Sequence, residues 1–248
     1  RPYVRSEDYS FLLAEGSEIL GICPLVLETQ TRGDGEIKEL SYDGLPCPAP
    51  ALRKGLAPER RRKLLRLVFD TVDELATTCG ALRTSFRSSP LAPAFQHQVG
   101  ARHHYLPRYG YLDVSISSQV LALDGAEPEI LRGMTKGHRY DIKRSSRLMD
   151  TKVFDAESVD EHTFKLYQDL HHKAAGRITR PSDTFEAMYE WVKSGRAILA
   201  GAKVGDQWVG FILAITYKDG AYYGSSADDP EFSHLPVSHA IQWASSLS

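Results

Sequence analysis

Residues 197–227 read AILAGAKVGDQWVGFILAITYKDGAYYGSSA, and this stretch decides the fold class. It holds three short apolar or alternating runs bounded by turn residues, as expected of buried strands. The runs are Ala197–Lys203, Trp208–Tyr217 and Gly220–Ala227. Because Gly205-Asp206 and Asp219-Gly220 are typical of hairpin turns, we expect a meander of three antiparallel strands.

A similar succession of elements is predicted near the N-terminus. Its expected strands are Phe11–Ala14, Ile19–Glu28 and Glu36–Tyr42. Gly21 in the run ILGIC takes the place of Gly210 in the run WVGFI. A helix is expected after the strands in each half. In the first half, an apolar stripe at i, i+3/i+4 spacing predicts a helix over Pro58–Cys79, capped by Gly80. In the second half, a helix is expected to begin near Pro236. The alternative is two unrelated meanders.

The repeat predicts an α+β or α/β chain of two tandem domains, residues 1–117 and 118–248. Each has a mixed, mostly antiparallel sheet flanked by helices. The first half is further expected to hold a proline-rich loop over 44–58, strands over 81–86 and 109–116, and a short helix near 92–99. The second half is expected to hold a helix over 127–149 broken at Gly133 or Gly137, and a strand over 151–155. Two more helices follow, one from a Ser158–Glu161 capping box to about Ala175, the other capped by Ser182 or Asp183.

Composition excludes several classes of protein. The chain has 248 residues, 42% of them hydrophobic and 25% charged, which is the range of globular domains. No apolar run approaches the roughly 18 residues that a membrane span needs. The three cysteines are widely spaced, with no CxxC, so we expect a reducing, cytoplasmic location. Because the chain begins at Arg1 without Met, we expect it to be the core of a longer protein.

The strongest local feature is basic. Residues 132–147 carry six cations against the single Asp141, on a chain whose net charge is −2. Five of them follow one another at spacings of 4, 3, 4 and 4: Arg132, Lys136, Arg139, Lys143 and Arg147. The sixth cation is Arg144. On one helix, these five would lie within a stripe of about 80°. Such a face is typical of phosphate binding, and a solvated face without a ligand is the alternative.

The last predicted strand carries hydroxyl groups. Strict alternation would place Tyr223 and Ser225 on one face of the sheet, and Tyr222 and Gly224 on the other. These hydroxyls could position an amine or a carbonyl, or the rings could simply pack the sheet. Asp228 follows as a candidate proton acceptor, with a turn-forming role as the alternative.

Several kinds of site are not predicted. Adjacent histidines such as His171-His172 and His103-His104 do not share a helix face, and no metal-ligand spacing occurs, so we expect no metal. The chain has no GxSxG elbow, no GxxxxGK[ST] loop and no GxGxxG after a strand. Hydrolases, P-loop NTPases and simple Rossmann enzymes are therefore disfavoured.

The order of elements resembles the FemABX-like branch of the GNAT superfamily, the peptidoglycan-bridge aminoacyltransferases. The resemblance rests on a basic helix (131–147), the strand TKVF (151–154), the run FKLYQDLH (164–171) before an Arg-rich loop that ends at Arg180, and the closing run 210–236. It implies twin GNAT-like domains and the transfer of an aminoacyl group from aminoacyl-tRNA to an amine. The acceptor would be a cell-wall precursor or a small natural product.

In an aminoacyltransferase mechanism, we expect the candidate residues to take the following roles, with substrate or solvent as alternatives to Asp228 for taking the proton from the amine. Tyr222, Tyr223, Ser225 and Asp228 would be catalytic, and strand N–H groups at a split in the second sheet would bind the oxyanion. The six cations of 132–147 and Arg180 would bind phosphate. No resident cofactor is implied, because residues 228–236 lack glycine and carry three acids, which makes a poor cradle for the pyrophosphate of CoA. The alternatives are an N-acyltransferase using acyl-CoA or a carrier-protein thioester, and a non-catalytic binding module.

Overall fold

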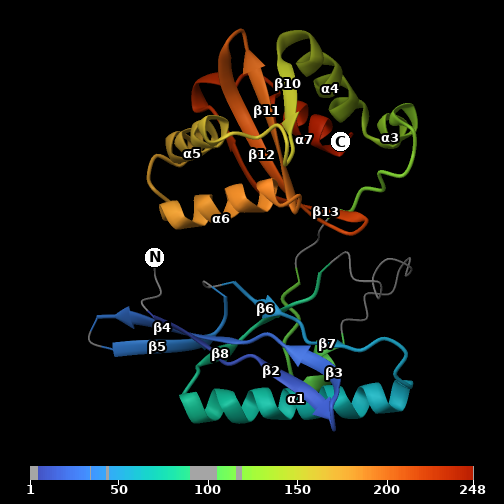
Figure 1. Ribbon diagram of the computed structural model, residues 1–248, viewed down its shortest axis with the longest axis vertical. Coiled ribbons are helices and arrows are strands. Elements are labelled where there is room, and N and C mark those ends of the chain that lie inside the picture. Colours follow the sequence, from blue (N-terminus) through green and yellow to red (C-terminus); the bar gives the residue numbers. More distant parts are fainter. Residues whose placement is uncertain (1–4, 34, 43–44, 90–104, 116–118, 248) are drawn as a thin grey trace. The chain divides into compact units, whose positions relative to one another are not determined.

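The computed structural model describes residues 5–33, 35–42, 45–89, 105–115 and 119–247. The chain divides into two compact units, Arg1–Val120 and Leu121–Ser248 (Figure 1). The boundary expected from the sequence, between 117 and 118, lies three residues before this division. Among the described helices, none is long and apolar enough to cross a membrane.

The described strands of the first unit form two sheets and one pair. Their order is β1-β4-β5-β8 in one sheet, β2-β3-β7 in the other, and β6-β9 in the pair. The strands are β1 (Arg5–Asp8), β2 (Phe11–Glu15), β3 (Glu18–Cys23), β4 (Val26–Arg32), β5 (Gly35–Leu40), β6 (Cys47–Pro48), β7 (Ala51–Leu52), β8 (Arg83–Thr84) and β9 (Phe86–Arg87). The single strand expected over 19–28 is wrong, because β3 and β4 belong to different sheets. Pro24, between them, has no N–H to continue the ladder.

Helix α1 (Pro58–Cys79) has the bounds predicted from its apolar stripe. Pro58 opens its first turn, and Gly80 ends it with a φ of 71°, a left-handed conformation that suits glycine. Val68 and Val72 are fully buried in one cluster with side chains of β2–β5. Figure 1 shows α1 running along these strands. The core of the first unit is therefore one helix packed on two adjoining sheets.

The strand expected over 109–116 is wrong in its described part. Leu106–Tyr109 is a short 3₁₀ helix, η1, and 111–115 form no strand. The ring of Phe69, on α1, lies 4.7 Å from that of Tyr109 and 5.3 Å from that of Tyr111. These tyrosines pack on the helix as an aromatic cluster, which removes them from any sheet. The expected helix near 92–99 lies outside the described residues.

The second unit has three layers. Its sheet is antiparallel throughout, in the order β10-β11-β12-β13. Helices α5 and α6 cover one face, and α4 and α7 cover the other (Figure 1). The elements are α3 (Glu127–Gly133), α4 (Lys136–Leu148), β10 (Asp150–Phe154), α5 (Glu161–Ala175), α6 (Ser182–Lys193), β11 (Ala197–Val204), β12 (Gln207–Tyr217), β13 (Gly220–Asp228), the 3₁₀ helix η2 (Pro230–Phe232) and α7 (Val237–Ser246). The predicted meander and the break after Gly133 are both confirmed.

Two predicted helix caps are wrong. The side chain that caps α5 is Asp160, which accepts a hydrogen bond from the Thr163 amide at 2.6 Å. The Ser158 hydroxyl instead donates to Asp155. Helix α6 begins at Ser182, so Pro181 stands at its cap position and contributes no side-chain hydrogen bond.

The two hairpins that suggested a repeat share a local irregularity. Gly21 pairs with Leu13, and the register shifts at the next pair along. Gly210 pairs with Ala202, and the register shifts in the same place. Both glycines also lie where another element approaches closely: a Cβ on Gly21 would lie 2.5 Å from Cδ2 of Leu52 at β7, and one on Gly210 would overlap a methyl group of Val237 at α7.

Candidate functional site

A polar cluster lies where α5 meets β13 in the second unit. Nη1 of Arg180 donates to Oγ of Ser225 at 3.0 Å, and lies 3.8 Å from the sulfur of Met188. Ser225 is buried, and no carboxylate among the described residues pairs with Arg180. A half-buried guanidinium without a counter-ion is costly unless an anion can join it. We call Tyr167, His171, Arg180 and Ser225 the arginine cluster.

Tyr167 and His171 complete this cluster from one face of α5. The Tyr167 side chain is fully buried, and its hydroxyl makes no hydrogen bond of normal geometry with any described group. Burial raises the pKa of Tyr167, although Ser225 and Arg180 oppose that shift. Burial, together with the charge of Arg180, lowers the pKa of His171, which favours the neutral form of its imidazole.

The sequence predicted only part of this arrangement. Arg180 and Ser225 were both candidates, at 45 residues' separation, and the structure brings them together. Tyr167 was missed as a site residue, because its i, i+4 spacing to His171 is equally typical of a packed helix face. The signal was a tyrosine within an apolar stripe, whose hydroxyl would have to be satisfied on burial.

The predicted alternation along β13 is wrong, because the strand contains a bulge. Ser225 pairs with Leu213 and Tyr223 with Ala214, which leaves Gly224 as the extra residue. Tyr222 and Ser225 therefore share the face that α5 and α6 cover. Tyr223 is on the other face, where its hydroxyl contacts that of Ser226. Gly224 fits the bulge, since a Cβ there would lie 3.0 Å from Cδ1 of Ile215.

The expected split in the second sheet does not occur between β12 and β13. The two strands pair from Gly210–Asp228 to Tyr217–Gly220, interrupted only by the bulge. Because β13 is the last strand in the described sheet, its outer edge has backbone N–H groups without a neighbouring strand. Any strand amides that bind an oxyanion would belong to this edge or to the bulge.

Asp228 ends β13 on the same face as Tyr223. Its Oδ2 accepts a hydrogen bond from the Ser238 hydroxyl at the start of α7, and its Oδ1 is buried without a partner among the described residues. Burial raises the pKa of Asp228, and the Ser238 hydrogen bond only partly opposes that shift. A carboxylate with a raised pKa is a better proton acceptor near neutral pH than an ordinary one.

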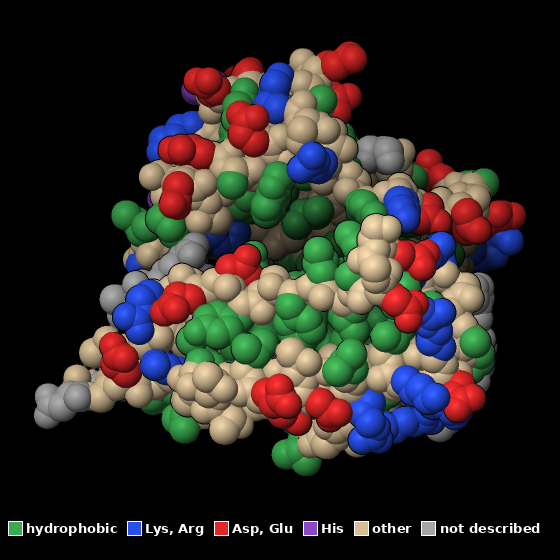
Figure 2. Space-filling view, turned by 60° about the horizontal axis from the view of Figure 1, so that its bottom comes forward, with side chains coloured by type: hydrophobic (Ala, Val, Ile, Leu, Met, Phe, Trp, Pro, Cys, Tyr) green, Lys and Arg blue, Asp and Glu red, His purple; other side chains and the backbone are tan. Residues whose placement is uncertain are grey.

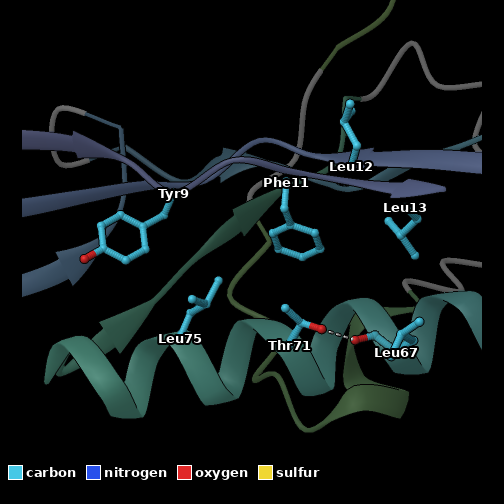
Figure 3. A pocket seen from close by; sticks show the side chains of 7 residues that line it. All are labelled: Tyr9, Phe11, Leu12, Leu13, Leu67, Thr71 and Leu75. Atoms are coloured by element: carbon cyan, nitrogen blue, oxygen red, sulfur yellow. Dashed lines mark hydrogen bonds between the residues drawn. The ribbon is translucent and has the colours of Figure 1, made fainter. Parts of the chain in front are cut away.

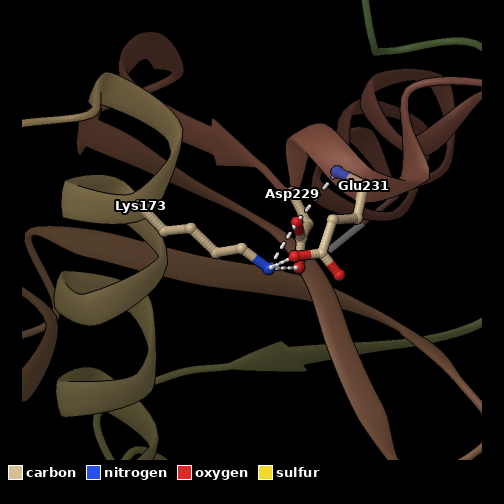
Figure 4. Close-up of polar contacts among 3 residues, drawn as sticks. All are labelled: Lys173, Asp229 and Glu231. Atoms are coloured by element: carbon tan, nitrogen blue, oxygen red, sulfur yellow. Dashed lines mark hydrogen bonds and ion pairs between the residues drawn. The ribbon is translucent and has the colours of Figure 1, made fainter.

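The acids that follow Asp228 are already paired (Figure 4). Nζ of Lys173, on α5, lies 2.8 Å from Asp229 and 2.9 Å from Glu231. Burial alone would raise the pKa of Asp229, but Lys173 and the Glu231 amide outweigh it and hold that pKa below its usual value. The loop between β13 and α7 is thus occupied by an internal ion pair, and presents carboxylates at the place where a pyrophosphate would need N–H donors.

The predicted stripe of five cations is divided between two helices. Arg132 lies on α3, and the side chain of Arg139 turns back to donate to the carbonyls of Arg132 and Met134. Arg139 therefore stabilises the C-terminus of α3, as a cation at a helix C-terminus does. Arg144 donates to the carbonyl of His234 at 3.4 Å. The remaining cations of α4 are Lys136, Lys143 and Arg147, all exposed.

Neither of two surface hollows contains a predicted site residue. One, of about 400 Å³, lies between β2 and α1 in the first unit, where Figure 2 shows a band of apolar side chains. Phe11 and Leu13 point toward α1 there, and the Thr71 hydroxyl is used within the helix by the Leu67 carbonyl (Figure 3). The other, of about 450 Å³, lies beside Lys152 and Trp208. Within the described residues, no group of three or more His, Cys, Asp or Glu side chains could hold a metal ion.

The architecture of both units together defines a class: the chain has the tandem, two-domain GNAT-like fold. The solved structure titled "Crystal structure of FemX" has this fold. The match covers 97% of this chain and 76% of that chain, with a TM-score of 0.59 and 13% sequence identity. The FemABX-like fold implied by the sequence is therefore confirmed. No protein-family model matches the chain, and no curated protein matches its sequence.

Proposed function

We propose that this chain is an aminoacyltransferase that moves an aminoacyl group from aminoacyl-tRNA to an amine. The observation that carries the proposal is the half-buried Arg180 guanidinium, held by Ser225 beside the Tyr167 hydroxyl and facing no described carboxylate. A bidentate cation of this kind suits a phosphate or carboxylate on the acceptor. The FemX-like fold supports the reaction class.

In the proposed reaction, the acceptor nitrogen attacks the ester carbonyl carbon. The C–N bond forms, the ester C–O bond breaks, and a ribose hydroxyl leaves. The nitrogen loses one proton and the departing oxygen gains one, so the transfer is neutral in protons. Asp228 is the proposed acceptor for the proton that an ammonium group must lose first, since burial raises its pKa. Tyr223, on the same face, would orient the amine.

The geometry of β13 gives the acceptor a length. Ser225 and Asp228 are three residues apart, which is about 10 Å along a strand. Because the two side chains lie on opposite faces, an acceptor with its anionic group at Arg180 would present its amine at least about 10 Å away, around the outer edge of β13. A cell-wall peptide precursor linked to a nucleotide, or an anionic natural-product intermediate, is the proposed acceptor, because each combines an anionic group with an amine. Tyr222, on the Arg180 face, precedes Ser225 along β13, away from Asp228, so it would contact the anionic end of the acceptor.

The donor is proposed to be tRNA-bound rather than CoA-bound. The loop after β13 holds the carboxylates of Asp229 and Glu231 beside Lys173, and several of its amides are bonded within the protein, so it is a poor cradle for a pyrophosphate. The exposed cations of α4 are proposed to meet RNA phosphates instead. The proposed compartment is the cytoplasm, where charged tRNA is found. No resident cofactor is proposed.

The test compares the two donors directly. Purified protein is incubated with a nucleotide-linked pentapeptide precursor of the cell wall, a panel of small amines, and either tRNA carrying a radiolabelled amino acid or labelled acetyl-CoA. The proposal predicts a labelled amide from the charged tRNA alone, and none after RNase treatment of the donor. Label transferred from acetyl-CoA, or transfer that survives RNase, would refute it.

A further inference from the structure

The outer face of α4 combines three cations with one aromatic ring. Lys136, Tyr140, Lys143 and Arg147 lie within about 60° of one another around the helix. The Tyr140 side chain is 66% exposed, although tyrosine rings usually pack against something. The opposite side of α4 carries Ile142 and Ser145, which are buried. We call Lys136, Tyr140, Lys143 and Arg147 the α4 stripe.

The side chains of the α4 stripe have no partner among the described residues. Its three cations form no ion pair with the described residues, and the Tyr140 ring makes no ring–ring or cation–π contact with them. The nearest acid on the helix, Asp141, points elsewhere, with Oδ2 lying 3.9 Å from the His239 ring at α7. The stripe is therefore an uncompensated positive track with a free ring in its middle.

We infer that the α4 stripe binds a single-stranded end of RNA, with one base stacked on Tyr140 and the flanking phosphates on the cations. Lys136 and Arg147 are eleven residues apart, about 16 Å along the helix, which is the length of two to three nucleotides. Proteins hold single strands by such a combination, an electrostatic track with an aromatic platform. The inference rests on the proposed function, and it names where the 3′ end of the tRNA donor is held.

An anionic membrane is the competing partner for a basic helix. A helix that lies in a membrane needs a broad apolar face to insert. On α4 that face is already buried against β10 and α7, and the stripe exposes only the Tyr140 ring among its cations. A single ring is sufficient for base stacking and insufficient for insertion, so the observations favour RNA.

Binding is measured by fluorescence anisotropy with a labelled, uncharged single-stranded RNA that ends in CCA. Loss of one stacked base weakens binding about 5- to 150-fold, so Y140A should show that loss and Y140F should not. Y217A is the matched control, because Tyr217 is also exposed but sits at the end of β12, away from α4. The triple variant K136Q/K143Q/R147Q should reduce the slope of log affinity against log salt by about 2.

Three outcomes would overturn the inference: no RNA binding by the wild type, equal affinity of Y140A and Y217A, or a salt slope that the triple variant leaves unchanged. Binding of the wild type to phosphatidylserine vesicles in place of RNA would also overturn it. These outcomes are separate from failure of the proposed function, because the probe carries no amino acid. If Y140A binds like wild type while aminoacyl transfer occurs, only the α4 site is wrong.

Discussion

Gly201 lies in the middle of β11, under two aromatic rings, and replacing it with alanine tests the packing of the second unit. The added Cβ would lie 2.7 Å from Cζ3 of Trp208 and 2.7 Å from Cε1 of Phe211. Carbon atoms pack at about 3.5–4.0 Å, so each ring would have to move by about 1 Å. The rings themselves are 5.0 Å apart between centroids and fully or partly buried, which leaves them little room.

Overpacking of this kind costs about 1–3 kcal/mol, and two rigid rings favour a value of about 2 kcal/mol. For a chain of this length, that cost lowers the melting temperature by about 4–8 °C. Thermal denaturation followed by circular dichroism measures the shift. G137A, in the first turn of α4, is the matched control, because a Cβ there meets only Oγ1 of Thr135 at 3.9 Å.

G137A should melt at the wild-type temperature or above it, since alanine favours a helix over glycine. If G201A melts at the same temperature as G137A, then the two rings do not lie on Gly201 as described. The packing described for the core of the second unit would then be wrong.

Three further predictions concern titratable groups. K173M leaves the Asp229 carboxylate buried without its partner. Because the pKa of Asp229 is lowered in the folded protein, the melting temperature of K173M should fall most at neutral pH, and the difference from wild type should vanish as the pH falls through that pKa. An equal difference at all pH values would contradict this. Burial raises the pKa of Asp228 in the folded protein, so the stability of wild type falls as the pH rises through that pKa. Over the same pH range, the melting temperature of D228N should rise relative to that of wild type. Parallel pH profiles of the two melting temperatures would contradict this. Burial raises the pKa of Cys23 to about 12, so iodoacetamide should label the less buried Cys79 first, as read by mass spectrometry, and preferential labelling of Cys23 would contradict this.

Periodicity predicted the elements that stand on their own hydrophobic pattern. Helix α1 and strands β11 to β13 have nearly the expected bounds, because each has a clear stripe or alternation with turn residues at its ends. The tyrosines of 109–111 could not be placed in this way. Their alternation fits a strand, and only the tertiary contact with Phe69 removes them from a sheet.

The candidate site was predictable as a set of residue types, but not as a geometry. Strict alternation placed Tyr223 with Ser225, and the bulge at Gly224 reverses that pairing. Helical spacing placed Arg139 with the phosphate-binding cations, whereas the loop after α3 lets its guanidinium reach the carbonyls of that helix. In both places a short backbone irregularity changes the direction of a side chain: one residue at Gly224, and two residues between α3 and α4. Sequence periods do not record such irregularities.

The contact between Arg180 and Ser225 carries the proposed function, and one measurement tests it most directly. The rate of labelled amide formation from charged tRNA is compared in wild type, R180Q and R177Q. Arg177 is exposed, three residues from Arg180, and has no described ion-pair partner, so R177Q is the matched control for loss of a charge. Loss of a charged hydrogen bond to the acceptor costs about 1.5–3 kcal/mol, which is a rate about 10- to 150-fold lower for R180Q. We expect that loss for R180Q and a near wild-type rate for R177Q; equal rates for the two variants would contradict the proposed role of Arg180.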